Sequence, residues 1–91
     1  MKARAHIYIS GRVQGVYYRG FTEELAEHLG LTGWARNLPD RRVEAVFEGE
    51  RTVIEEAINK CRSGPPAAHV TDIEVRWEDK LKGFKDFSIR Y

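Results

Sequence analysis

Hydrophobic and polar residues alternate along several short segments of the chain. In residues 4–10 the apolar positions Ala5, Ile7 and Ile9 are two residues apart. A period of two places alternate side chains on one face of a β-strand, so this segment is predicted to be a half-buried strand. Four further short segments are predicted to be strands: 32–37, 42–48, 69–77 and 87–91.

Two longer segments have helical spacing instead. Between residues 18 and 29, one face carries residues three and four apart: Tyr18, Phe21, Thr22, Leu25, Ala26 and Leu29. Residues 51–62 have the same spacing, in Val53, Ile54, Ala57, Ile58 and Cys61. Both segments are therefore predicted to be amphipathic helices. Gly30 suits a left-handed C-terminal cap of the first helix, and Thr52 with Glu55 has the spacing of a capping box in the second.

These elements follow one another in the order β-α-β-β-α-β, with one further strand after them. A short polar turn at 38–41 predicts that the strands on either side form a hairpin, and Gly49 is predicted to break the chain before the second helix. Each helix has a single apolar stripe, so both are expected on one face of a mainly antiparallel sheet. The predicted fold class is an α+β two-layer sandwich, formed as one domain by residues 1–91.

Composition narrows the classes of function. The 91 residues include 15 Lys and Arg against 14 Asp and Glu, a balance that disfavours a dedicated nucleic-acid-binding protein. With 42% hydrophobic residues, the composition excludes a disordered chain. We expect no signal peptide, because the first twelve residues lack an apolar segment, and no membrane helix, because no apolar stretch approaches roughly 18 residues. The single cysteine excludes a disulfide scaffold. We therefore expect a cytoplasmic protein that is a monomer, with a small oligomer as the alternative.

The segment SGRVQGVYYR, residues 10–19, carries the most informative chemistry. It leads from a strand into a helix through a loop with two glycines, and the first turn of a helix leaves backbone N–H groups without intrahelical partners. Such groups favour an anion, and Arg19 in that first turn can hold two phosphoryl oxygens. Neither a Walker loop nor a GxGxxG motif is present. A tight connection with an ordinary surface arginine is the alternative explanation.

Asn37 is the second candidate, at the end of the strand 32–37. Asparagine before a proline turn commonly serves local hydrogen bonding, and that alternative stays open. Its carboxamide offers both a donor and an acceptor, which can orient a water molecule. Asn37 and Arg19 can act together only if this strand ends beside the loop at 10–19.

The segments GRVQGVYYR, GWARNLPD, SGPPAAHV and FKDFSIRY resemble the acylphosphatase family, and the resemblance covers essentially the whole chain. It implies a ferredoxin-like α/β sandwich and hydrolysis of acyl phosphates, R–CO–O–PO₃²⁻, without a metal or organic cofactor. It also implies that Arg19 binds the phosphoryl group and that Asn37 positions the attacking water. The implied phosphate cradle is made of backbone N–H groups: those of Gln14, Gly15, Val16, Tyr17 and Tyr18.

The chain departs from the family's pattern at three positions. Tyr17 stands where the family most often has a small residue, Cys or Phe, and Tyr18 stands in place of Phe. Tyr18 therefore adds a hydroxyl that needs a hydrogen-bond partner. Arg41 replaces the glycine that usually follows Asp40, so a left-handed conformation there would cost about 1 kcal/mol of strain.

Two other classes of function remain as alternatives. The first is a phosphate- or carbamoyl-phosphate-binding module with little catalysis. The second is a single-stranded RNA binder with the same order of elements, for which Tyr8 on the solvated face of the first strand gives slight support. The three histidines lack metal-ligand spacing, so a metal site is not expected, and Cys61 is predicted to be a core residue rather than a nucleophile.

Overall fold

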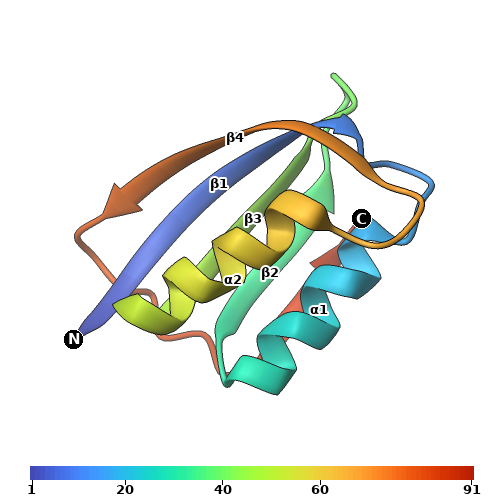
Figure 1. The fold of residues 1–91 in the computed structure, drawn as a ribbon. Coiled ribbons are helices and arrows are strands. Elements are labelled where there is room, and N and C mark those ends of the chain that lie inside the picture. The colour runs from blue at the N-terminus through green and yellow to red at the C-terminus, as the bar shows by residue number, and fades with distance from the viewer.

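The computed structural model describes all residues from Met1 to Tyr91, with five strands and two helices (Figure 1). The elements are, in chain order, β1 (Lys2–Arg12), α1 (Tyr18–Leu29), β2 (Thr32–Asn37), β3 (Val43–Glu50), α2 (Arg51–Ser63), β4 (His69–Glu78) and β5 (Phe87–Arg90). The predicted order is confirmed. The predicted break at Gly49 is wrong, because β3 continues through Gly49 and the next residue after the strand is already helical.

The strands form one sheet in the order β4-β1-β3-β2-β5. β3 is antiparallel to both β1 and β2, and β4 is antiparallel to β1. β5 adds the one parallel pairing, alongside β2. Since β1 and β2 are both antiparallel to β3, the strands β1, β2 and β5 all point the same way. Their carboxyl ends therefore meet at one edge of the sheet.

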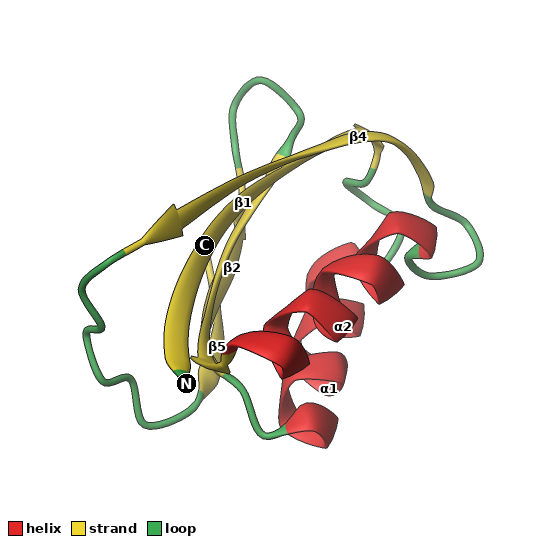
Figure 2. Cartoon of the chain, turned by 60° about the vertical axis from the view of Figure 1, so that its left-hand side comes forward, coloured by secondary structure: helices red, strands yellow, loops and turns green.

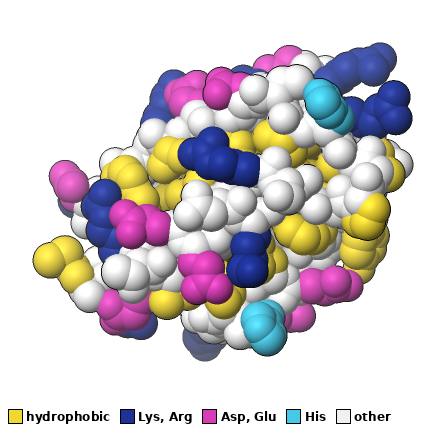
Figure 3. Space-filling model, in the orientation of Figure 1, with side chains coloured by type: hydrophobic (Ala, Val, Ile, Leu, Met, Phe, Trp, Pro, Cys, Tyr) yellow, Lys and Arg dark blue, Asp and Glu magenta, His cyan; other side chains and the backbone are white.

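Both helices cover the same face of this sheet (Figure 2). The core between the two layers is apolar and fully enclosed; Ile7 and Ile9 of β1, Phe47 of β3 and Ile54 of α2 have no exposed surface. Lys/Arg and Asp/Glu side chains are interspersed over the outer surface of the helices (Figure 3), in keeping with the balanced charge of the sequence. The predicted α+β sandwich is thus confirmed, with a mixed sheet.

The two predicted helix caps have different outcomes. Gly30 does cap α1 in a left-handed conformation, with φ 72°, and its N–H donates to the carbonyls of Ala26 and Glu27. The capping box of Thr52 and Glu55 is wrong. α2 starts at Arg51 directly from β3, so Thr52 already lies inside the first turn and no side chain caps the helix. Glu55 pairs instead with Arg51, 3.5 Å away.

The face of the sheet without helices carries a cluster of ion pairs, which the sequence pattern did not predict. Arg4 donates hydrogen bonds to Glu48 at 2.7 Å and to Glu78 at 2.5 Å. His6 lies between the carboxylates of Glu44 and Glu78, at 2.5 Å and 3.3 Å. This cluster links the three neighbouring strands β4, β1 and β3 by their side chains as well as by their backbones.

Glu48 accepts more hydrogen bonds than the other carboxylates of this cluster. Besides Arg4, it accepts hydrogen bonds from the backbone N–H groups of Lys82 and Gly83, and so holds the connection from β4 to β5. Burial acts to raise the pKa of Glu48, but these hydrogen bonds outweigh it and leave the pKa below its ordinary value. Glu44 has a lowered pKa for the same reason, through hydrogen bonds from Arg36 and His6.

The turn between β2 and β3 contains a left-handed arginine. The Leu38 N–H donates to the Arg42 carbonyl and the Arg41 N–H donates to the Leu38 carbonyl, at 2.8 Å and 3.1 Å. Closing this turn gives Arg41 a φ of 79°. The turn thus does require the left-handed conformation whose cost at Arg41 was considered from the missing glycine. The exposed Arg41 side chain forms no salt bridge that offsets the strain.

Replacing Arg41 by glycine should stabilise the protein. Arg41→Gly removes the steric penalty of a Cβ in the left-handed region, so we expect the free energy of unfolding to rise by about 1 kcal/mol. Urea denaturation measures the change. Arg41→Ala is the control, since it removes the charge but keeps the strained Cβ; an equal gain in both variants would contradict the explanation by strain.

The lowered pKa values predict a loss of stability in acid. A carboxylate with a lowered folded-state pKa stabilises the protein above its unfolded pKa, here about 4.5, and this contribution is lost as the pH falls through the folded value. Glu48→Gln should lower the free energy of unfolding by about 3 kcal/mol at pH 7, because Arg4 loses a buried partner.

Urea denaturation at several pH values between 7 and 2 tests both statements. In Glu48→Gln the decline below about pH 4.5 should be shallower than in the wild type. Glu55→Gln, at an exposed ion pair, should change stability by less than about 0.5 kcal/mol. An acid decline as steep in Glu48→Gln as in the wild type would exclude a contribution from Glu48.

Candidate active site

The loop between β1 and α1 presents a row of backbone N–H groups. Gly15 and Tyr17 have left-handed φ values of 75° and 69°, whereas Gln14 and Val16 do not have positive φ. Such alternation turns successive N–H groups toward the same side and makes a concave anion site. The N–H groups of residues 14–17 donate no hydrogen bond within the protein. They therefore remain available to an anion at the start of α1, where the helix dipole also favours negative charge.

Arg19 lies in the first turn of α1, close to the end of β5. Its Nη1 donates to the Arg90 carbonyl over a long 3.4 Å, and its guanidinium lies 4.8 Å from the centre of the Tyr91 ring. No carboxylate forms a salt bridge with Arg19. Most of its donors are therefore free to bind a ligand, and its charge is not neutralised by a neighbouring acid.

Asn37 is the last residue of β2. Its Oδ1 is buried and has no hydrogen-bond partner, and it is the one buried side-chain polar atom in the protein with that property. An unpaired buried acceptor is costly in a folded protein unless water or a ligand supplies the donor.

These features share one pocket of about 200 Å³. Its lining residues are Val13, Gly15, Tyr17, Tyr18, Arg19, Gly20, Asn37, Ile89 and Tyr91. The strand 32–37 thus ends beside the loop, as the joint action of Arg19 and Asn37 requires. Of the residues predicted for the phosphate cradle, Gln14 and Val16 do not line the pocket; the Val16 side chain packs against the core instead.

Gln14 has a side-chain role that the sequence did not reveal. Its Nε2 donates to the carbonyl oxygens of Leu38 at 2.8 Å and Arg42 at 3.0 Å. These two bonds tie the loop after β1 to the turn that directly follows Asn37. No sequence signal identifies these contacts, because Gln14 lies 24 positions before Leu38 and 28 positions before Arg42.

The side chain of Tyr18 has a structural role, whereas the predicted role of its backbone N–H in the phosphate cradle stays a prediction. Its side chain is buried, and its hydroxyl donates to the Cys61 carbonyl at 2.6 Å, which supplies the partner that this hydroxyl needs. Burial raises the pKa of Tyr18 strongly, so the hydroxyl stays protonated. The start of α1 is thereby attached to α2.

Outside this pocket, the other groups considered from the sequence are the Cys61 thiol, a metal site and a membrane helix. Burial raises the pKa of the Cys61 thiol to about 12, which keeps it protonated and supports its predicted place in the core. The structure contains no group of three or more His, Cys, Asp or Glu side chains arranged to hold a metal ion. None of its helices combines the length and the apolar character needed to cross a membrane.

Comparison with known proteins identifies the family. The family model for acylphosphatase matches residues 5–89. The chain belongs to the acylphosphatase family. An acylphosphatase of Syntrophobacter fumaroxidans is 52% identical over 90 residues, which is 99% of this chain and 93% of that protein. The crystal structure of an acylphosphatase from Bacillus subtilis is 37% identical and superposes with a TM-score of 0.95 over 100% of both chains.

Acylphosphatases hydrolyse acyl phosphates, so the family, the enzyme class and the reaction predicted from the sequence are confirmed. The roles of Arg19 and Asn37 remain predictions. The same fold also occurs within a larger protein: full-length HypF, in its phosphate- and nucleotide-bound form, matches with 30% identity and a TM-score of 0.88. That match covers 100% of this chain and 12% of the HypF chain.

Gln14 should affect both stability and rate. Gln14→Ala removes two hydrogen bonds but leaves each carbonyl its backbone donor, so we expect the free energy of unfolding to fall by about 1 kcal/mol. Because the turn after Asn37 loses its tie to the loop, kcat should also fall by about tenfold. Urea denaturation and steady-state kinetics measure the two effects. Gln14→Ala with wild-type stability and rate would show that the two hydrogen bonds do not position the site.

Proposed function

We propose that this acylphosphatase hydrolyses acyl phosphates in the pocket between the loop at 13–17, Arg19 and Asn37. One observation carries the proposal. Unbonded backbone N–H groups, an arginine without an acidic partner and an unpaired buried amide oxygen line or adjoin a single pocket. Each of these groups matches one need of phosphoryl transfer: binding of the charged oxygens, stabilisation of the transition state and placement of water.

In this proposal the loop and Arg19 bind the phosphoryl group. The phosphoryl oxygens are acceptors, and the N–H groups of residues 14–17 are donors that need no rearrangement to meet them. Arg19 adds a planar fork of donors that is charged at every working pH. These groups stabilise the negative charge on the oxygens as the bond to phosphorus breaks.

Asn37 holds the attacking water. Its Oδ1 accepts a hydrogen bond from the water, whose oxygen then attacks phosphorus opposite the acyl oxygen. The P–O bond to the acyl group breaks and the carboxylate leaves with the bonding electrons. One proton of the water remains on its oxygen and the other passes to a phosphoryl oxygen, so that R–CO–O–PO₃²⁻ and water give R–COO⁻ and H₂PO₄⁻.

This route needs no strong base from the protein. A carboxylate is a good leaving group, because the pKa of an ordinary carboxylic acid is only about 4. The site therefore needs neither a carboxyl group with a raised pKa nor a lysine with a lowered pKa to act as a general base. We propose that neither a metal nor an organic cofactor takes part.

We further propose that residues 1–91 work as one monomeric domain in the cytoplasm, with a small acyl phosphate and no nucleic acid as partner. The face of the sheet without helices supports the absence of a nucleic-acid partner. The Tyr8 ring there already contacts the guanidinium groups of Arg42 and Arg76, at 4.9 Å and 5.5 Å. Its face is not free to stack on a base.

Replacing Arg19 or Asn37 should abolish most of the activity. With benzoyl phosphate in excess chelator, Arg19→Ala and Asn37→Ala should each lower kcat/KM by about 10²–10³-fold, or roughly 3–4 kcal/mol of transition-state stabilisation. The loss of ultraviolet absorbance follows the reaction.

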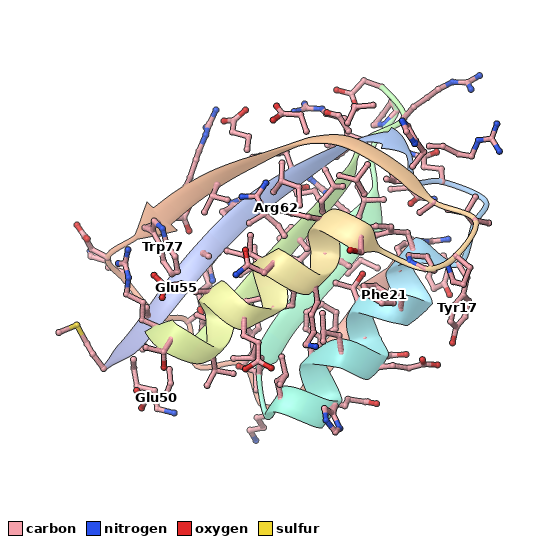
Figure 4. All side chains as sticks on the ribbon, viewed as in Figure 1. Tyr17, Phe21, Glu50, Glu55, Arg62 and Trp77 are labelled. Atoms are coloured by element: carbon pink, nitrogen blue, oxygen red, sulfur yellow. The ribbon has the colours of Figure 1, made fainter.

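Matched controls lie on the exposed surface of α2, where Arg62 is labelled in Figure 4. Arg62→Ala and Asn59→Ala should keep the wild-type rate. If the wild type hydrolyses no acyl phosphate but binds inorganic phosphate, the pocket is a phosphate-binding module and the catalytic roles are excluded. Equal rates in the wild type and both site variants would exclude these two side chains.

A further inference from the structure

Tyr17 combines backbone strain with exposure at the mouth of the pocket. Its φ of 69° lies in the left-handed region, which is disfavoured for a residue with a Cβ. Its side chain is nevertheless large and 64% exposed, so burial in the core does not account for its presence. Strained residues of this kind persist where the surrounding structure holds them, and they concentrate at functional sites.

The Tyr17 ring is held in one position. It lies directly against Gly20 in the first turn of α1, where an added Cβ would be only 2.3 Å from the ring. Its hydroxyl donates to Glu24 one turn further along the helix, at 2.5 Å. Figure 4 shows Tyr17 at the edge of the molecule, beside the start of α1. The ring is thus a fixed aromatic surface with one side on the helix backbone and the other open to solvent.

This surface lies where the acyl part of a substrate would leave the pocket. Tyr17 and Gly20 line the same pocket as Arg19 and Asn37. If the phosphoryl group occupies the loop, the acyl group extends toward the pocket mouth, where Tyr17 and Tyr91 are the exposed aromatic residues. The Tyr91 ring already contacts the Arg19 guanidinium. Tyr17 therefore offers the free ring for contact with an acyl group.

We propose that Tyr17 is a specificity-determining residue whose ring binds the acyl group, so that the enzyme prefers acyl phosphates with an aromatic or similarly large apolar acyl group over those with a small one. This inference rests on the proposed function of the pocket. An aromatic acyl group gains a ring–ring contact with Tyr17, whereas an acetyl group is too small to cover the ring.

The test compares kcat/KM for benzoyl phosphate with kcat/KM for acetyl phosphate. The ratio of the two cancels any effect of a variant on the phosphate loop itself. Tyr17→Gly, which suits the left-handed backbone, should lower the ratio by about three- to tenfold, chiefly through a higher KM for benzoyl phosphate. Tyr17→Phe keeps the ring and should keep the ratio within about twofold of the wild type.

Gly20→Ala provides a second, independent variant. It leaves Tyr17 in the sequence but forces its ring away from the helix, so the ratio should fall as in Tyr17→Gly. Circular dichroism confirms that each variant is folded.

An unchanged ratio in Tyr17→Gly or in Gly20→Ala would overturn the inference. This holds even if kcat/KM falls equally for both substrates, because an equal loss indicates only that the loop is misplaced. The proposed function then stands, since both substrates are still hydrolysed by the wild type. A wild type that hydrolyses neither substrate would overturn the proposed function and this inference with it.

Discussion

The common direction of β1, β2 and β5 is the constraint on which the site depends. β3 lies between β1 and β2 and is antiparallel to both, so it forces their carboxyl ends to the same edge of the sheet. The loop of residues 13–17 follows β1, Asn37 ends β2, and Tyr91 follows β5. Residues from three distant parts of the chain therefore converge without any local sequence signal that brings them together. Gln14 then fixes the distance between two of these segments by side-chain hydrogen bonds.

Local patterns in the sequence were sufficient to locate the strands and helices and to single out Arg19 and Asn37 as candidate site residues. The period-two and helical spacings located the strands and helices, and the motif around Arg19 and Asn37 indicated the family. Contacts between distant residues were not predictable in this way. The parallel pairing of β2 with β5, the ion pairs around His6 and the side-chain role of Gln14 all join segments with no shared local pattern. The capping box at Thr52 failed for the opposite reason, because a local motif was overridden where β3 leads straight into α2.

The two faces of the sheet are stabilised by different physics. The covered face buries apolar side chains against the helices, whereas the open face holds carboxylates by charge-assisted hydrogen bonds from Arg4, Arg36 and His6. The pocket lies at the edge, outside both regions. Val13 in the core and Val16 packed against it anchor the loop, while the backbone N–H groups of residues 14–17 stay without partners in the protein. The loop is thus held by apolar contacts while its backbone N–H groups remain unpaired.

The place of β1 in the sheet also has a consequence for how the chain acquires its structure. β1 has neighbours on both sides, and one of them is β4, where Arg12 pairs with His69 and Arg4 with Glu78. During synthesis β1 emerges long before β4, so one side of a central strand stays unpaired until residues 69–78 are available. Most of the sheet joins partners far apart in sequence, a high contact order that favours slow folding for a domain of this size. The unfinished sheet meanwhile exposes a hydrogen-bonding edge to other chains.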